Sequence, residues 1–219
     1  MSARISDSAV RRLSLYLRML RDLRRAGVEL VSSRELAERA GATSAQVRKD
    51  LSLFGSFGKR GRGYDVSALA DTLEEILGLS EAWRVGIVGV GKIGSALLGY
   101  RALDARGFDI VAAFDVDPEK VGSRPFGVTV YDVADLKRVI GRLGVDIGIV
   151  ATPPDAARDV AVGLARAGVG AILNFAPTEL HDIEGVPVRT VDIVLELEGL
   201  SYILTAAGRG RDASSRATG

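Results

Sequence analysis

The sequence predicts an α/β protein in two parts: an N-terminal winged helix-turn-helix domain and a C-terminal Rossmann domain with a doubly wound parallel sheet. Before residue 80 the apolar residues recur at helical spacing, and the one strand-like stretch is a short hairpin near 57–66. From residue 83 onward, short β-branched runs alternate with helical segments, and the first run ends in the glycine motif GVGKIG. We expect domains at 1–80 and 81–190, a helix at 191–207 and a disordered polar tail at 208–219.

The first domain is predicted to contain three helices, a wing and a linking helix. Residues 10–25 carry their leucines on one helical face. A second helix begins at Ser32 and a third at Thr43, and both starts, SSRE and TSAQ, have the spacing of a capping box. A tight glycine-containing turn joins these two short helices into a helix-turn-helix. A β-ribbon wing at 57–64 and a linking helix at 68–80 follow.

The net charge of +1 conceals an asymmetry between the two parts. Residues 1–64 contain 14 Lys and Arg against 6 Asp and Glu, whereas residues 65–219 contain 15 against 22. A basic module joined to an acidic one suggests that the first part meets an anion. Chance scatter of surface charge is the alternative.

The third helix of the first domain predicts a surface for duplex DNA. Its apolar residues Val47, Leu51 and Phe54 stand at i, i+4 and i+7, so they face the core and turn the polar residues outward. The wing adds basic side chains on a glycine-rich backbone that can approach a sugar-phosphate strand, with Gly61 and Gly63 leaving room. A solvated basic helix beside a mobile loop is the alternative. The residues expected at DNA are Gln46, Arg48, Lys49, Ser52, Lys59, Arg60, Gly61 and Arg62.

The second domain contains the dinucleotide fingerprint in its expected context. GVGKIG follows the apolar run VGIV and opens the helical stretch SALLGY, and Asp115 ends the next strand. We expect Gly89 to make the turn, Gly91 to admit the pyrophosphate and Gly94 to allow close packing, although all three could serve a structural turn alone. Asp115 would bond the adenosine ribose and repel a 2′-phosphate, which favours NAD(H) over NADP(H). The motif residues expected at the cofactor are Gly89, Val90, Gly91, Lys92, Ile93 and Gly94.

Two further strand ends are expected to line the same crevice, because the carboxyl ends of parallel strands meet at one edge of a sheet. ATPPD offers Thr152 and Pro153, and NFAP offers Asn174, Phe175 and Ala176. Thr152 and Asn174 can bond ribose or carboxamide groups, and the other three can wall an apolar pocket. Ordinary strand-end turns are the alternative.

Composition excludes several classes of function. The chain has no cysteine and one histidine, His181, which excludes disulfides, thiolate sites, thiol redox sensing and histidine-rich metal sites, so we expect no metal. A dehydrogenase needs a proton donor or acceptor beside its nicotinamide, and His181 lies in the loop-like stretch LHDIEG, so we expect a binding protein rather than an enzyme. No apolar run approaches the ~18 residues of a membrane span, and we expect a cytoplasmic location.

Together, the motifs resemble the Rex family of redox-sensing transcriptional repressors. The resemblance runs from about residue 8 to 205, and its most specific parts are QVRKDLSLFGSFGKRGRGY, GVGKIGSALLGY, FDVDPEKVG, ILNFAP and VDIVLELEGLSYIL. It implies a homodimer that exchanges its last helix between subunits, binds a pseudo-palindromic operator in double-stranded DNA and is released by NADH. By family position, it implies Arg12, Lys49, Arg60 and Gly61 near DNA, Tyr100 near the nicotinamide, and a switch of Arg18, Tyr100 and Asp192 that senses the bound state.

The reduced cofactor is expected to bind more tightly than the oxidised one. Oxidised nicotinamide is a cation, and moving it into an apolar pocket of Phe175, Ala176 and Ile193 is costly without a paired anion. NADH and operator DNA would then stabilise different arrangements of one dimer, so that each weakens binding of the other. Two alternatives remain open: an NAD-dependent oxidoreductase with a basic appendage, and a CoA-binding domain of the succinyl-CoA synthetase type.

Overall fold

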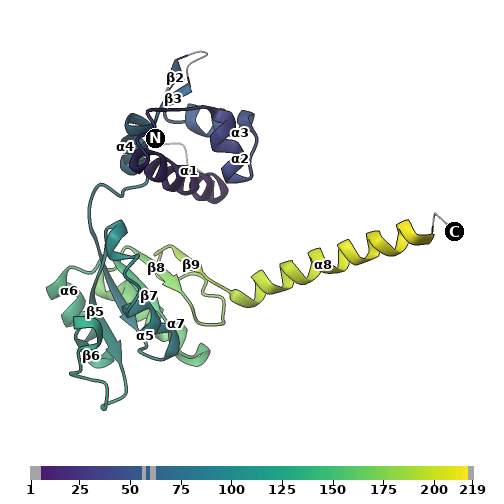
Figure 1. The fold of residues 1–219 in the computed structure, drawn as a ribbon. Coiled ribbons are helices and arrows are strands. Elements are labelled where there is room, and N and C mark those ends of the chain that lie inside the picture. The colour runs from purple at the N-terminus through teal and green to yellow at the C-terminus, as the bar shows by residue number, and fades with distance from the viewer. Residues whose placement is uncertain (1–5, 56–57, 60–62, 217–219) are drawn as a thin grey trace. The chain divides into compact units, whose positions relative to one another are not determined.

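The computed structural model describes residues 6–55, 58–59 and 63–216, with side chains described for 6–55 and 63–206. The chain folds into two compact units, Met1–Glu81 and Ala82–Gly219, and Figure 1 labels their elements where there is room. The boundary lies one residue from the expected position. Each unit has a hydrophobic core of its own.

The first unit is a winged helix-turn-helix. Its short strands form an antiparallel sheet in the order β1-β3-β2. The sequence did not reveal β1, because two residues are too few to show an alternation of apolar and polar side chains. Helix α4 begins and ends earlier than the predicted range 68–80. In chain order the elements are α1 (Asp7–Arg25), β1 (Leu30–Val31), α2 (Ser33–Ala40), α3 (Ser44–Ser52), β2 (Gly58–Lys59), β3 (Gly63–Asp65) and α4 (Val66–Ile76).

The starts of α2 and α3 agree with the sequence, but only one of the two predicted capping boxes forms. Ser32 and Glu35 cap α2 reciprocally, each side chain accepting from the other's backbone amide. Thr43 caps α3 by accepting from the amide of Gln46. The side chain of Gln46, however, reaches forward to Asp50 instead of back to Thr43. The second capping box is therefore a simple N-cap.

Gly63 has a structural reason that the sequence did not suggest. Its φ is +82°, and a Cβ atom at this position would lie 2.6 Å from the carbonyl oxygen of Val31 in β1. A side chain would therefore push β3 away from β1. Gly63 is therefore needed for the pairing of these two strands, and the room that it would leave for DNA stays a prediction.

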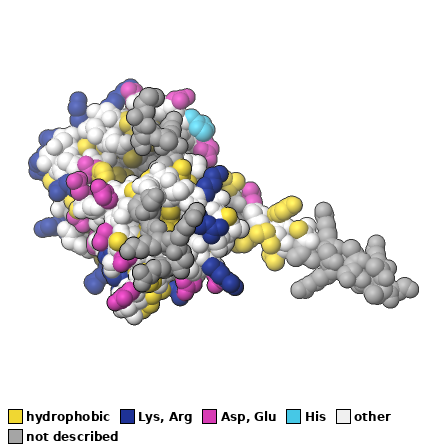
Figure 2. Space-filling view, turned by 90° about the horizontal axis from the view of Figure 1, so that it is seen from above, with side chains coloured by type: hydrophobic (Ala, Val, Ile, Leu, Met, Phe, Trp, Pro, Cys, Tyr) yellow, Lys and Arg dark blue, Asp and Glu magenta, His cyan; other side chains and the backbone are white. Residues whose placement is uncertain are grey.

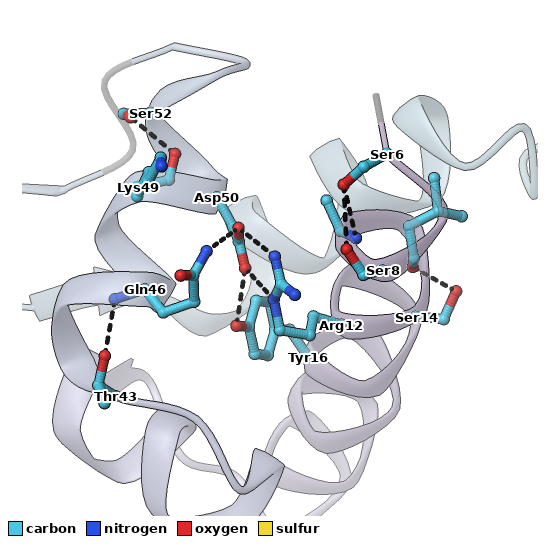
Figure 3. A network of polar contacts seen from close by, with 12 residues as sticks. Ser6, Ser8, Arg12, Ser14, Tyr16, Thr43, Gln46, Lys49, Asp50 and Ser52 are labelled. Atoms are coloured by element: carbon cyan, nitrogen blue, oxygen red, sulfur yellow. Dashed lines mark hydrogen bonds and ion pairs between the residues drawn. The ribbon is translucent and has the colours of Figure 1, made fainter. Parts of the chain in front are cut away.

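A buried carboxylate links α1 to α3 in the first unit (Figure 3). Asp50 is 2% exposed and accepts four hydrogen bonds. Arg12 donates from Nε and Nη2 over 2.7 and 2.8 Å, Tyr16 from its hydroxyl over 3.0 Å, and Gln46 from Nε2 over 2.7 Å. Burial alone would raise the pKa of Asp50, but the hydrogen bonds from Arg12, Gln46 and Tyr16 outweigh burial and hold this pKa below its usual value.

The second unit is a Rossmann fold with a six-stranded, fully parallel sheet in the order β6-β5-β4-β7-β8-β9. The short β-branched runs that the sequence shows from residue 83 onward form strands of this sheet. The sequence did not reveal β9, a three-residue strand directly after a proline. The strands are β4 (Trp83–Val88), β5 (Phe108–Asp115), β6 (Val130–Asp132), β7 (Ile147–Val150), β8 (Ala171–Asn174) and β9 (Val188–Thr190). The helices are α5 (Lys92–Leu98), α6 (Leu136–Leu143) and α7 (Pro154–Ala167), with 3₁₀ turns at Asp104–Arg106, Pro125–Gly127 and Val133–Asp135.

Helices cover both faces of this sheet. Successive strand residues point to opposite faces, so Ile87 packs in the cluster with Leu98 of α5, whereas Val88 packs in the cluster with residues of α6 and α7. The two clusters make the doubly wound arrangement that the alternating strands and helices predicted. Strand order reverses direction at the β4–β7 pair, which places the ends of these two strands side by side.

Helix α8 (Ile193–Arg216) extends beyond the predicted range 191–207. The tail expected to be disordered from residue 208 is helical as far as Arg216, and residues 217–219 lie outside the described part. The helix begins at Asp192, whose Oδ1 accepts from the amides of Val194 and Leu195. Its described apolar side chains are uncovered (Figure 2), and Ile193, for example, is 62% exposed. Among the described residues, no helix combines the length and apolar character that crossing a membrane requires.

We expect Gly94→Ala to destabilise the second unit by about 1–3 kcal/mol. The new methyl group would overlap the carbonyl oxygen of Gly89, a backbone atom that no side-chain rotation can move. Urea unfolding followed by the fluorescence of Trp83, the single tryptophan, measures the change in this unit. Gly141→Ala in α6 is the matched control: it meets no atom within 4 Å and should stabilise by up to about 1 kcal/mol. Equal stability of Gly94→Ala and the parent would disprove the close approach.

Tyr16→Phe should reduce the decline in the free energy of unfolding as the pH rises into the alkaline range. Burial and the hydrogen bond to Asp50 raise the pKa of Tyr16 to about 12, above its value near 10 in unfolded chains. A raised pKa contributes stability that is complete below pH 10 and is lost as the pH rises through 12. Denaturant unfolding followed by circular dichroism between pH 9 and 12 should therefore show a smaller decline for Tyr16→Phe than for the parent. Tyr202→Phe, at an exposed position, is the control; identical declines for parent and Tyr16→Phe would contradict the prediction.

Candidate functional site

The ends of β4 and β7 lie side by side at the point where the strand order reverses, and the space outside them is the candidate crevice. Gly89 follows β4 with a φ of +97°, and a Cβ atom there would lie 2.5 Å from the carbonyl oxygen of Ala151, which follows β7. Only glycine allows the two strand ends to approach this closely. Ligands of open α/β sheets bind outside the carboxyl ends of strands at such a reversal.

Gly91 differs from the other two glycines of the motif, because nothing in the chain requires it. It lies in an extended conformation directly before α5, and a Cβ atom there would meet no atom within 4 Å. Gly89 is fixed by its backbone conformation, and Gly94 by contact with the carbonyl of Gly89. The space in front of Gly91 is open, and a side chain would fill it. This is the arrangement that a phosphate group approaching the backbone needs.

Asp115 lies at the end of β5, 8% exposed, and holds the glycine turn in place. Its Oδ2 accepts from the amide of Val90 over 2.7 Å and from Nζ of Lys120 over 3.2 Å, and its Oδ1 accepts from the amide of Asp117 over 3.0 Å. Burial alone would raise the pKa of Asp115, but these hydrogen bonds outweigh it and lower that pKa. Asp115 is therefore a stable anion. Oδ1 accepts a single hydrogen bond from the described residues, so it keeps acceptor capacity.

Thr152 supplies an unused polar atom beside this turn. Its Oγ1 is buried and has no hydrogen-bond partner among the described residues. Its methyl group lies 3.1 Å from the position of a Cβ atom on Gly89. A buried hydroxyl without a partner is costly, so this atom is available to a ligand in the crevice. Pro153 is exposed and directly precedes α7.

The end of β8 differs from the predicted ligand wall. Asn174 is fully buried, with Nδ2 donating to the carbonyls of Ala176 and Thr178 and Oδ1 accepting from the amide of Ala176. Its amide builds the turn after the strand and is not presented to a ligand. Phe175 packs on the α5 side of the sheet and Ala176 on the other side, so they do not form one wall. The sequence missed this because neighbouring strand residues alternate between faces.

The other predicted cofactor residues differ in burial: one is buried and the others are exposed. Val90 is buried in the core cluster beside α5, which orients the turn. Lys92, Ile93, Tyr100 and Ile193 have exposed side chains, the last on α8. Among the described residues, this end of the sheet therefore brings together the glycine turn, Asp115 and Thr152.

The residues expected at DNA fall into three groups. Lys49 and Ser52 are exposed on α3, and the Ser52 hydroxyl donates to the carbonyl of Lys49. Arg12 and Gln46 are bound to Asp50, and Arg48 donates to the hydroxyl of Ser33 over 3.1 Å. The wing lies largely outside the described residues. Lys59 belongs to β2, but its side chain is not described, and neither are Arg60, Gly61 and Arg62.

Two residues that contact the candidate site residues escaped the sequence analysis. Asp50 adjoins the buried Leu51 and stands three residues after Val47, and this position on the inner side of α3 was the available signal. Lys120 follows Asp115 by five residues in FDVDPEK, and the turn at 117–120 brings it back to the carboxylate. Of the predicted switch, Arg18 is exposed on α1, and Asp192 caps α8. Their contact stays a prediction.

Comparison with known proteins supports both units. Residues 4–52 match the family described as "Putative DNA-binding protein N-terminus", and residues 80–178 match the one described as "CoA binding domain". The chain is 48% identical to the redox-sensing transcriptional repressor Rex of Streptomyces griseus, over 90% of this chain and 78% of that protein. It is 46% identical to the protein of the same name from Carboxydothermus hydrogenoformans, over 91% of this chain and 96% of that protein.

Solved structures of RSP, a Rex-family repressor, have the same two-unit architecture. RSP in complex with β-NAD⁺ and operator DNA is 36% identical with a TM-score of 0.89, covering 97% of this chain and 98% of that one. RSP in complex with β-NADH is 35% identical to this chain with a TM-score of 0.86. The match covers 96% of this chain and 99% of that one. Identity of this level over nearly the whole length of both chains leaves one conclusion: the chain belongs to the Rex family of redox-sensing transcriptional repressors.

Proposed function

We propose that this chain is a transcriptional repressor that binds double-stranded operator DNA as a homodimer and leaves it when NADH binds. The observation that carries the proposal is its likeness, over nearly the full chain, to RSP, which was solved with operator DNA and β-NAD⁺ and also with β-NADH. A winged helix-turn-helix and a glycine-turn crevice in one chain provide the two surfaces that such a protein needs.

NAD(H) fits the crevice of the second unit. The pyrophosphate would occupy the open space at Gly91, and the adenosine ribose would donate to the free acceptor capacity of Asp115. The unpartnered hydroxyl of Thr152 would bond a polar group of the cofactor. The reduced cofactor has a neutral nicotinamide and the oxidised one a cation, so an apolar surrounding built with Phe175 favours NADH over NAD⁺.

The exposed apolar residues of α8 support a homodimer in which this helix packs against the partner. A helix with uncovered Ile, Val and Leu on several sides needs another surface to cover it. Exchange of α8 between two copies would bury these side chains and bring Ile193 of one copy to the cofactor of the other, which would supply the apolar wall. Two-fold symmetry then requires a pseudo-palindromic operator with two half-sites.

Release by NADH follows if the cofactor and the DNA favour different arrangements of the dimer. The half-sites of a duplex are set at a fixed helical spacing, so two recognition helices that change their separation lose contact with one of them. Thermodynamic linkage makes the effect mutual: NADH weakens DNA binding by the factor by which DNA weakens NADH binding. Arg18 and Asp192 are our candidates for a contact between subunits that forms in one arrangement only.

We also propose that the chain is not an enzyme and does not bind CoA. The described titratable group at the crevice, Asp115, is an anion held by two backbone amides and Lys120, which suits binding rather than proton transfer. The same anion would repel the phosphate on the adenosine ribose of CoA. The "CoA binding domain" match therefore reflects the shared fold of the second unit.

The direct test is a gel shift with a duplex that the full-length protein itself selects from a random library. Saturating NADH should release this duplex, and equal concentrations of NAD⁺ should release much less. Gly91→Val should bind the duplex normally and no longer respond to NADH, because its side chain would fill the space that the pyrophosphate needs. Its Cβ atom meets no protein atom within 4 Å, so we expect stability to stay within about 0.5 kcal/mol. Complexes of the parent chain that persist unchanged in NADH would refute the proposal.

Asp115→Ala should weaken the binding of NADH and strengthen the binding of NADPH. The substitution removes the ribose acceptor and leaves Lys120 as a cation beside the position of a 2′-phosphate. Fluorescence titration with both cofactors measures the ratio of their dissociation constants. In the control, Asp115→Ala combined with Lys120→Ala, the gain for NADPH should disappear. A single variant that weakens both cofactors equally would show that Asp115 does not face the ribose.

A further inference from the structure

We propose that Asp50 is a positioning residue of the DNA-binding surface: it holds Arg12 and Gln46 in one fixed arrangement and cancels the charge of Arg12. The inference rests on the proposed function, because it concerns the surface that would read operator DNA. Asp50 belongs to neither the exposed face of α3 nor the wing. It would act through the two side chains that it binds.

The geometry leaves Asp50 no freedom. Arg12 Nε and the Tyr16 hydroxyl donate to Oδ2, and Arg12 Nη2 and Gln46 Nε2 donate to Oδ1 (Figure 3). Each of the two carboxylate oxygens thus accepts two hydrogen bonds. Together these bonds use all four lone-pair sites of the carboxylate. The Asp50 side chain is 3% exposed, whereas that of Arg12 is 25% exposed. The carboxylate is inside, and the groups it holds reach the surface.

Both held side chains keep groups with which they can read a base edge. Arg12 uses two of its five N–H groups on Asp50, and Gln46 uses one of its two N–H groups and retains its amide oxygen. Arginine bound to guanine and glutamine bound to adenine are common pairings in the major groove. Because α1 and α3 share one carboxylate, the orientation of one side chain fixes that of the other. Arg12 and Gln46 therefore act as one reading unit.

The charge of Arg12 is cancelled within the unit. Its guanidinium forms a bidentate pair with Asp50, so the pair contributes little net attraction for phosphate. Lys49, exposed on the same helix as Gln46, has no such constraint from Asp50. An unpaired cation at a phosphate steepens the salt dependence of binding by about 0.9 in log–log slope. The pair thus favours sequence discrimination over general affinity for DNA.

The test compares the full-length parent with Asp50→Asn on two probes, the duplex that the parent selects from a random library and one fixed duplex of unrelated sequence. Each carboxylate oxygen of Asp50 faces an N–H group of Arg12, so the asparagine amide nitrogen must meet a guanidinium that can only donate. The bidentate pair therefore breaks, and Arg12 becomes an unpaired cation. Binding of the unrelated duplex should strengthen, with a salt slope steeper by about 0.9. The ratio of affinities for the selected and unrelated duplexes should fall roughly ten-fold or more.

Two further variants separate positioning from structure. Glu38→Gln also removes one negative charge and frees an exposed arginine, Arg34, in the same unit, and it should retain the sequence preference of the parent. Arg12→Met combined with Asp50→Leu replaces the pair by apolar residues, which proteins commonly tolerate, and it applies even if Asp50→Asn fails to fold. This double variant should lose sequence preference while keeping the parental salt slope.

Three results would overturn the inference. The first is that Asp50→Asn weakens binding of both duplexes by the same factor at an unchanged salt slope, as replacement of a purely structural residue would. The second is that Glu38→Gln loses sequence preference as Asp50→Asn does, and the third is that the double variant keeps it. A parent chain that selects no sequence at all would instead refute the proposed function.

Discussion

A carboxylate buried in a protein has to be satisfied by hydrogen bonds, and here the groups that satisfy it belong to the functional surfaces. Asp50 and Asp115 are the buried charged side chains among the described residues. Asp50 draws its donors from α1 and α3, and Asp115 from the glycine turn, from the chain beyond β5 and from Lys120. Losing either anion would leave several donors without acceptors. Each carboxylate therefore fixes the local geometry on which one binding surface depends.

The three glycines of the motif show how one residue type serves different physical needs. At Gly89 the backbone conformation and the approach of β7 exclude a side chain, and at Gly94 the packing of α5 on the turn excludes one. At Gly91 the protein itself would accept a side chain. The glycine that the fold does not need is the one that a ligand needs. This contrast gives the fingerprint physical content beyond its spacing.

Much of the fold follows from local sequence, because caps and periodicity act over a few residues. The starts of α2 and α3 at Ser32 and Thr43 and the strand–turn–helix at GVGKIG are of this kind. Contacts between distant segments could not be predicted. Arg12 and Tyr16 of α1 bond Asp50 of α3, which lies 38 and 34 residues further along the chain. Local side-chain bonds also escaped where two partners compete: Gln46 bonds Asp50 instead of completing its expected cap, and Asn174 turns inward to the loop after β8. The short strands β1 and β9 carry no periodic signal, and they exist because a neighbouring strand pairs with them.

The carboxylate of Asp192, at the start of α8, can bind the helix and a further group at the same time. Asp192 accepts two amide hydrogen bonds through one oxygen, Oδ1, and no described residue bonds its Oδ2. A cation arriving at the second oxygen can therefore pair with Asp192 without unwinding the helix. The same carboxylate can thus hold the first turn of α8 and carry a charge pair at the same time.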